Sequence, residues 1–179
     1  MDYYWIDQDE EYKKAPPEYQ EKILVLRKEL QRLFFIAQIR LAQTYNLPVV
    51  IHNRDAGTDT LEILKETNCQ KFILHCFSED LEFAKACIDF APECMVSFSG
   101  IVTFQNAKDI QETAQHIPLK NIIIETDAPY LTPVPYRGKR ENESALVAHV
   151  FEKICELRSE SRDEIEKQIY ENSRKIFRL

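Results

Sequence analysis

Three short apolar runs each end in residues that can bind a metal ion or exchange protons. His52 ends the run PVVIH, His75 ends KFILH, and Glu125 and Asp127 follow NIII. Imidazole nitrogens and carboxylate oxygens are ligands for divalent ions, and an ion held by them can orient a water molecule as a nucleophile. A single histidine at such a position is more often a hydrogen-bonded structural residue, but three coinciding ends indicate one shared site. Asp127 is a better ligand candidate than Glu125, which lies two residues earlier on the same strand face.

The elements that must position these residues follow from the apolar pattern. Four apolar runs predict strands ending near residues 52, 75, 98 and 125, and amphipathic segments between them predict helices over about residues 59–67, 80–90 and 107–117. A longer helix is expected before the first strand, with one apolar stripe formed by Ile23, Leu26, Leu30, Leu33, Phe34, Ala37 and Leu41. Two more helices close the chain, over about residues 144–157 and 162–177. Strands that are apolar nearly throughout and alternate with helices are typical of a parallel sheet.

In a parallel sheet the carboxyl ends of all strands lie at one edge, where loops converge and sites are built. We therefore expect His52, His75 and Asp127 to lie close together. Cys76 directly follows His75 and should point to the opposite face of its strand, which makes it a poor ligand candidate.

Composition excludes several classes of protein. The 179 residues include 44% apolar residues, which is enough for one globular domain spanning residues 1–179. No apolar run is long enough to cross a membrane, and the opening residues do not resemble a secretory signal. Five cysteines without a CxxC pair favour reduced thiols, and hence a cytoplasmic location, or a nuclear one in a eukaryote. The net charge of −7 argues against a nonspecific grip on nucleic acid, although a bound cation would alter the local charge.

Basic and aromatic residues near the strand ends could contact a nucleic acid. Arg54 follows the first strand in HNRDA, and Arg137 belongs to the loop PYRGKR. Guanidinium groups suit phosphate, but a basic loop is more often solvated surface. Tyr3, Tyr4, Trp5, Tyr130 and Tyr136 could stack on bases or simply pack.

Six segments, taken in order, resemble the TatD-type deoxyribonucleases, a metal-dependent branch of the amidohydrolase-like barrels. They are DYYW, PVVIHNRDA, ILHCFSED, VSFSGIVTF, IIIETDAPYLTPVPYRGKR and ENSRKIF. The resemblance implies a partial (β/α)₈ TIM-type barrel of the α/β class, which would form the C-terminal half to two-thirds of that fold. It also implies one or two divalent ions, such as Mg, Mn or Zn, and hydrolysis of DNA phosphodiester bonds, commonly as an exonuclease.

The same resemblance implies roles for individual residues. His52, His75 and Asp127 would be metal ligands, and Asp127 would also accept a proton from the attacking water. Arg54 and Arg137 would lie near the substrate phosphates.

The sequence departs from the family pattern in three places. The family begins with a strand carrying a His-x-His pair, which occurs nowhere in this sequence, and its metal-bridging carboxylate precedes the DYYW segment, where this chain has only Met1. Glu79 takes the place of the glycine in the HCFSG motif usual for the family, and Glu141 looks inserted after PYRGKR. A (β/α)₈ barrel typically takes about 250 residues. We therefore expect that this chain lacks the N-terminal strands of the barrel and binds metal weakly. We also expect it to self-associate through exposed sheet edges.

Three functions remain open from the sequence. The first is a metal-dependent deoxyribonuclease, whose activity in this chain is in doubt. The second is a catalytically silent chain that acts by binding a protein partner. The third is a hydrolase of small amides or esters, which the basic PYRGKR loop favours less than a phosphate substrate.

Overall fold

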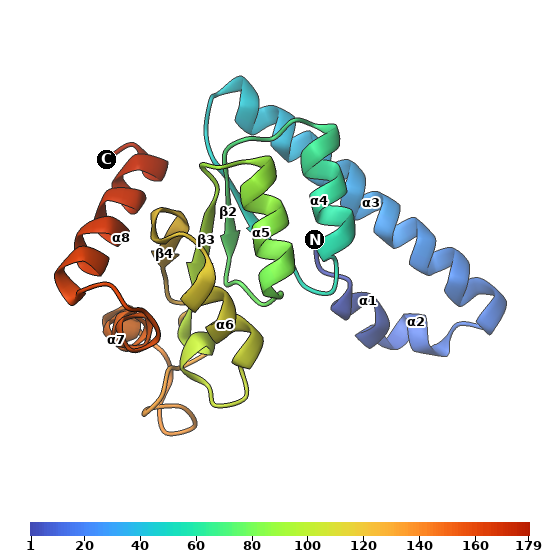
Figure 1. The fold of residues 1–179 in the computed structure, drawn as a ribbon. Coiled ribbons are helices and arrows are strands. Elements are labelled where there is room, and N and C mark those ends of the chain that lie inside the picture. The colour runs from blue at the N-terminus through green and yellow to red at the C-terminus, as the bar shows by residue number, and fades with distance from the viewer.

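The computed structural model describes residues 1–179, apart from the side chain of Asp7. Four parallel strands alternate with helices, and a long helix projects at one edge of the molecule (Figure 1). The strands are β1 (Val49–His52), β2 (Phe72–His75), β3 (Met95–Phe98) and β4 (Ile122–Ile124). The helices are α1 (Tyr4–Gln8), α2 (Glu10–Lys14), α3 (Pro17–Thr44), α4 (Gly57–Glu66), α5 (Leu81–Phe90), α6 (Lys108–His116), α7 (Val147–Leu157) and α8 (Arg162–Phe177), with 3₁₀ turns η1 (Gly100–Thr103), η2 (Leu119–Asn121) and η3 (Ser144–Leu146).

The sheet has the order β1-β2-β3-β4, and every neighbouring pair is parallel. Each strand is joined to the next through one helix, so the chain advances one strand at a time. This confirms the predicted alternation of strand and helix. It also brings the carboxyl ends of all four strands to one edge of the sheet.

The main core lies between one face of the sheet and the helices that surround it. Ile51, Phe72, Leu74, Val96 and Phe98 from alternate strand positions are buried there. Because side chains alternate along a strand, the residues between them point to the other face.

The second face of the sheet is covered unevenly. Ile73, Met95 and Ile123 form a small buried cluster with Ile176 of α8. On β1, by contrast, Val50 is 56% exposed. The uncovered part of this face therefore lies at the β1 edge, beside His52.

Helix α8 stabilises the opposite edge of the sheet. The predicted capping box is present, since Ser161 accepts from the Glu164 backbone and the Glu164 side chain accepts from the Ser161 backbone. Further along the helix, the Asn172 amide donates to the carbonyl oxygens of Leu119 at 2.9 Å and Ile122 at 2.7 Å. These bonds attach β4 to α8.

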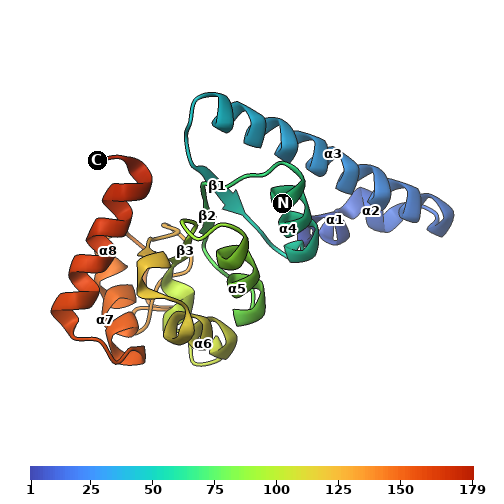
Figure 2. The same cartoon turned by 45° about the horizontal axis from the view of Figure 1, so that its top comes forward.

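Helix α3 forms as predicted, but its apolar stripe faces solvent. Of its described residues only Ile39 is buried, and Phe35 and Ile36 pack partly against the core. Leu26, Leu33 and other large residues of the stripe are exposed. Figure 2 shows α3 along the outer edge of the molecule, with α1, α2 and α4 to one side of it.

Among the described residues, no helix is both long and apolar enough to cross a membrane.

Candidate metal centre at the carboxyl ends of the strands

The two predicted histidine ligands lie side by side. His52 and His75 are paired across β1 and β2 in the parallel register, and their ring centroids are 6.3 Å apart. Both are the last residues of their strands, where the backbone turns outward into a loop. The sheet register thus produces the expected juxtaposition.

A third group at the site, Asp2, is one that sequence reasoning missed. Its Oδ2 lies 2.9 Å from His52 Nε2. Asp2 forms a parallel β-bridge with Arg54 and is held by two 2.8 Å hydrogen bonds with the Gln31 side chain of α3. Residues 1–3 are too few to show a strand or helix pattern in the sequence. Only the folded chain therefore reveals that they lie against the end of β1.

His75 is held between two carboxylates. Its Nδ1 lies 2.6 Å from Glu125 Oε1, and its Nε2 lies 3.6 Å from Asp127 Oδ1. Glu125 also accepts from the Cys76 backbone N–H at 2.7 Å and from the Ser97 hydroxyl at 2.5 Å. A carboxylate with three donors orients the imidazole and directs its Nε2 toward Asp127, as carboxylates behind metal-binding histidines do.

The environment of these groups shifts two pKa values. Hydrogen bonding to Glu125 raises the pKa of His75 above its ordinary value, although burial acts in the opposite direction. Burial raises the pKa of Cys76 to about 11, and its sulfur contacts Ser99 Oγ at 3.0 Å. Cys76 is therefore a neutral, buried thiol.

The donors suit a divalent ion in type, but they form two separate groups, one around His52 and one around His75. Imidazole nitrogen and carboxylate oxygen are ligands for Zn²⁺ and similar ions. Nevertheless, no three His, Cys, Asp or Glu side chains among the described residues are grouped closely enough to hold one ion. His52 is directed to Asp2 and His75 to Glu125 and Asp127, so the ligand set is incomplete as folded.

The two predicted phosphate-binding arginines stack on aromatic rings. The guanidinium carbon of Arg54 lies 3.6 Å from the Tyr4 ring centroid, and that of Arg137 lies 3.6 Å from the Phe104 centroid. Stacking fixes the plane of a guanidinium while its N–H edge can still donate. Of the aromatics considered for base stacking, Tyr3 is buried and bonds Asp59 at 2.6 Å, so it packs.

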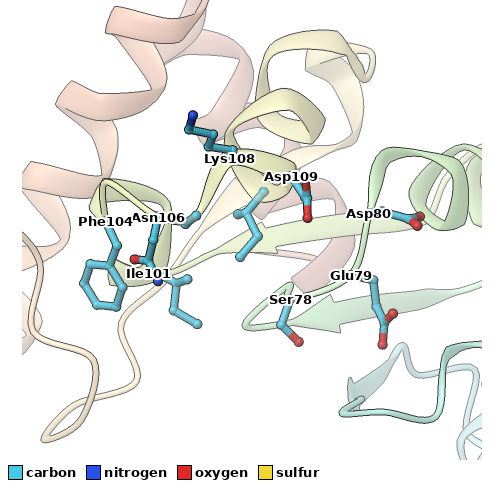
Figure 3. A pocket seen from close by; sticks show the side chains of 10 residues that line it. Ser78, Glu79, Asp80, Ile101, Phe104, Asn106, Lys108 and Asp109 are labelled. Atoms are coloured by element: carbon cyan, nitrogen blue, oxygen red, sulfur yellow. The ribbon is translucent and has the colours of Figure 1, made fainter.

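A cavity of about 420 Å³ opens between the loop after β2 and the segment that follows β3 (Figure 3). Its polar lining includes Glu79, Asp80 and Asp109 against Lys108. Three carboxylates and one ammonium group do not favour an anion. The charge of this cavity therefore does not suit phosphate, the group that Arg54 and Arg137 are expected to contact.

Glu79, which departs from the family pattern, is accommodated by its neighbours. It accepts from Asn53 Nδ2 at 2.7 Å, and Asn53 in turn accepts from Thr60 Oγ1 at 3.0 Å. Its carboxyl also lies 3.2 Å from the position that a Cβ on Gly57 would take. The absence of a side chain at Gly57 thus leaves room for Glu79.

We expect Glu79→Gln to stabilise the protein at neutral pH. Burial, followed by the charges of Asp80 and Asp55, raises the pKa of Glu79 above 4.5. A raised pKa means that the folded state holds the proton more tightly, so stability is present below pH 4.5 and declines as pH rises through the folded pKa. Glutamine keeps the acceptor for Asn53 without the charge, and the gain at pH 7 should be at most about 1 kcal/mol, since the group is only partly buried.

Urea unfolding of both proteins at pH 5 and pH 8 measures this effect. The free energy of unfolding of Glu79→Gln should exceed that of the parent by more at pH 8 than at pH 5. The exposed control Glu112→Gln should leave the free energy of unfolding unchanged at both pH values. A variant less stable than the parent at pH 8 contradicts the sign of the prediction.

Comparison with known proteins identifies the family of this chain. The pattern of the family described as TatD related DNase matches residues 1–178. The chain is 44% identical over 154 residues to YabD of Bacillus subtilis, described as an uncharacterized metal-dependent hydrolase; the match covers 85% of this chain and 59% of YabD. It is 41% identical over 152 residues to YcfH of Escherichia coli, which has the same description, covering 83% and 56%.

Solved structures show the same fold. YjjV, a TatD homologue of Escherichia coli, superposes with a TM-score of 0.79 at 28% identity and covers 84% of this chain and 57% of its own. A TatD-family hydrolase of Entamoeba histolytica superposes with a TM-score of 0.73 at 20% identity. These matches confirm the predicted fold class, parallel strands alternating with helices as in part of a TIM-type barrel.

The chain spans less than three-fifths of the length of these relatives, with 59% and 56% of the two hydrolases and 57% of YjjV matched. Within that span the family pattern runs almost from end to end. The chain therefore belongs to the TatD-related DNase family.

Proposed function

We propose that this chain hydrolyses phosphodiester bonds of DNA with the help of a divalent metal ion. The observation that carries the proposal is the placement of His52 and His75 side by side at the strand ends, with Asp127 Oδ1 3.6 Å from His75 Nε2. Family membership supports the hydrolase chemistry, and the two stacked arginines support a phosphate substrate over an amide or ester.

Each residue has a distinct part in this proposal. His52, His75 and Asp127 would hold the ion, which would supply a Lewis acid and an activated water. Asp127, whose side chain is 37% exposed, would accept a proton at its carboxylate from the attacking water. Arg54 and Arg137 bind phosphate oxygens through their N–H edges.

The separation of the donors into two groups predicts weak metal binding. The sequence has no His-x-His pair, and among the described residues no three donors converge on one point. Metal binding must displace the His52–Asp2 contact or include it. We therefore expect millimolar Mg²⁺ or Mn²⁺ to be needed and turnover to be slow.

Digestion of end-labelled single-stranded DNA by the purified chain tests this function. We expect cleavage with Mg²⁺ or Mn²⁺, none with EDTA, and a loss of about 100-fold or more in His75→Ala, since a direct ligand should matter at least as much as its supporting partners. His116→Ala is the matched control, because His116 is exposed on α6 and its ring hydrogen-bonds the Glu112 carbonyl of the same helix.

Calorimetric titration with Mn²⁺ separates binding from chemistry. Cleavage that persists in EDTA, or that is unchanged in His75→Ala, contradicts the proposal. A folded chain that neither binds metal nor cleaves DNA supports the alternative, a protein-binding role without catalysis.

A further inference from the structure

Helix α3 has two apolar faces, and only one of them is covered. Ile39 is buried, and Phe35 and Ile36 pack against the core. On the same side, Gln31 bonds Asp2, and Arg32 forms an ion pair with Glu66 of α4. These contacts fix the helix against the body of the protein.

The opposite face carries a continuous apolar stripe. It consists of the predicted stripe without Phe34, which lies at its flank, and is extended by Tyr19. Its members follow one another at spacings of four and three residues: Tyr19, Ile23, Leu26, Leu30, Leu33, Ala37 and Leu41. The large side chains of the stripe other than half-buried Ile23, together with the flanking Phe34, are 45% to 68% exposed. In Figures 1 and 2 this helix lies at the edge of the molecule, with its neighbours to one side. A helix that is apolar on both sides is normally enclosed on both.

We propose that two copies of this chain form a dimer through this α3 stripe. Spacings of four and three residues let the side chains of one helix fit between those of another helix with the same spacing. The α3 helix of a second copy has that spacing by definition. A twofold axis brings one patch against itself, so no other surface is required.

The area of the stripe suits a stable dimer. Six large side chains that each expose roughly 100 Å² of apolar surface, with Ala37 and part of Ile23, give about 700 Å² per copy, near the ~800 Å² per partner of a typical specific interface. It also exceeds the few hundred Å² of apolar patch that a monomeric protein usually exposes.

Charge does not oppose this pairing. The chain carries −7 overall, but the residues flanking the stripe have both signs, with Lys22 and Arg40 beside Glu29 and with Arg27 on the other side. Two copies can therefore approach along α3 without facing the bulk of the negative charge. This inference is independent of the proposed catalysis, because it uses none of the residues at the strand ends.

Sedimentation equilibrium of the whole chain, from about 1 to about 200 μM, tests the proposal. We expect a dimer whose dissociation constant rises at least about 30-fold in Leu30→Glu/Leu33→Glu, since both changes introduce a charge at the centre of the interface. Gln38→Glu adds a charge to an exposed position of α3 outside the stripe and should leave the constant within about threefold. Because both leucines are exposed, circular dichroism should show folded protein, and the milder Leu30→Gln should shift the constant in the same direction.

Several outcomes overturn the proposal. One is a wild-type chain that stays monomeric at every concentration tested, even if it binds a different protein. Another is a dimer whose dissociation constant does not change in the double variant. A dimer weakened by Val50→Lys but not by the stripe variants would place the interface at the exposed edge strand β1 instead.

Discussion

Gly100→Ala should destabilise this protein more than alanine at either of the other two glycines, Gly57 and Gly138. A Cβ at this position would lie 1.9 Å from the Leu131 carbonyl oxygen and 3.2 Å from Pro133 N. Both obstacles are backbone, so no side-chain rotation can relieve the overlap. Either η1 or the loop after β4 must move, and we expect a loss of at least about 3 kcal/mol in the free energy of unfolding.

The same substitution should disturb the candidate site. The loop is attached to η1 where the Val134 N–H donates to Thr103 Oγ1 at 2.9 Å, and Thr103 Oγ1 bonds the Gly100 carbonyl at 2.7 Å. Further along the loop, Arg137 stacks on Phe104. Displacing the loop should therefore move Arg137 and, under the proposed function, weaken binding of single-stranded DNA.

Urea unfolding and fluorescence anisotropy with labelled DNA measure the two effects. Gly138→Ala is the matched control, because Gly138 has φ 73° and no described atom lies within 4 Å of its would-be Cβ. Its cost is conformational alone, about 1 kcal/mol. Equal losses in the two variants would show that the contact with Leu131 does not constrain the fold.

Replacing Glu125 should have the second largest effect. Glu125→Leu leaves the Cys76 N–H, the Ser97 hydroxyl and His75 Nδ1 without their acceptor, and Ser97 is fully buried. Unsatisfied buried donors cost about 1–3 kcal/mol each, so a loss of about 3 kcal/mol or more in stability is expected. Thermal and urea unfolding measure it.

The milder Glu125→Gln distinguishes orientation from stability. Glutamine retains an acceptor oxygen but lacks the charge, so the pKa of His75 should fall toward its ordinary value. NMR titration of the imidazole measures this change, and Mn²⁺ titration should show affinity lowered by about 10- to 100-fold. Glu141→Gln, in an exposed loop, is the control; an unchanged His75 titration in Glu125→Gln would show that Glu125 does not orient the ring.

Much of the architecture could be predicted from the sequence because it depends on local pattern. The apolar runs around residues 49–52, 72–75, 95–98 and 122–124 are short and bounded by polar residues, so they indicate strands regardless of context. The capping box at Ser161 and Glu164 is likewise a local signal. Once the strands are parallel, His52 and His75 must reach the same edge.

Other features required the tertiary structure. The spacing of leucines in α3 predicts an apolar stripe, but whether that stripe faces the core or solvent depends on which neighbours enclose the helix. Sequence likewise ranked Asp127 above Glu125 as a ligand. It could not show that Glu125 accepts from three donors, since Ser97 belongs to a different strand.

The sequence by itself therefore determined which residues lie at the strand ends and which family the chain resembles. The tertiary structure decided that Asp2 approaches His52, that Arg54 and Arg137 stack on rings, and that the candidate metal-binding donors form two separate groups. The reason is physical: strand and helix patterns arise from residues a few positions apart. These contacts instead join segments far apart in the chain, and their geometry depends on the packing of the whole protein.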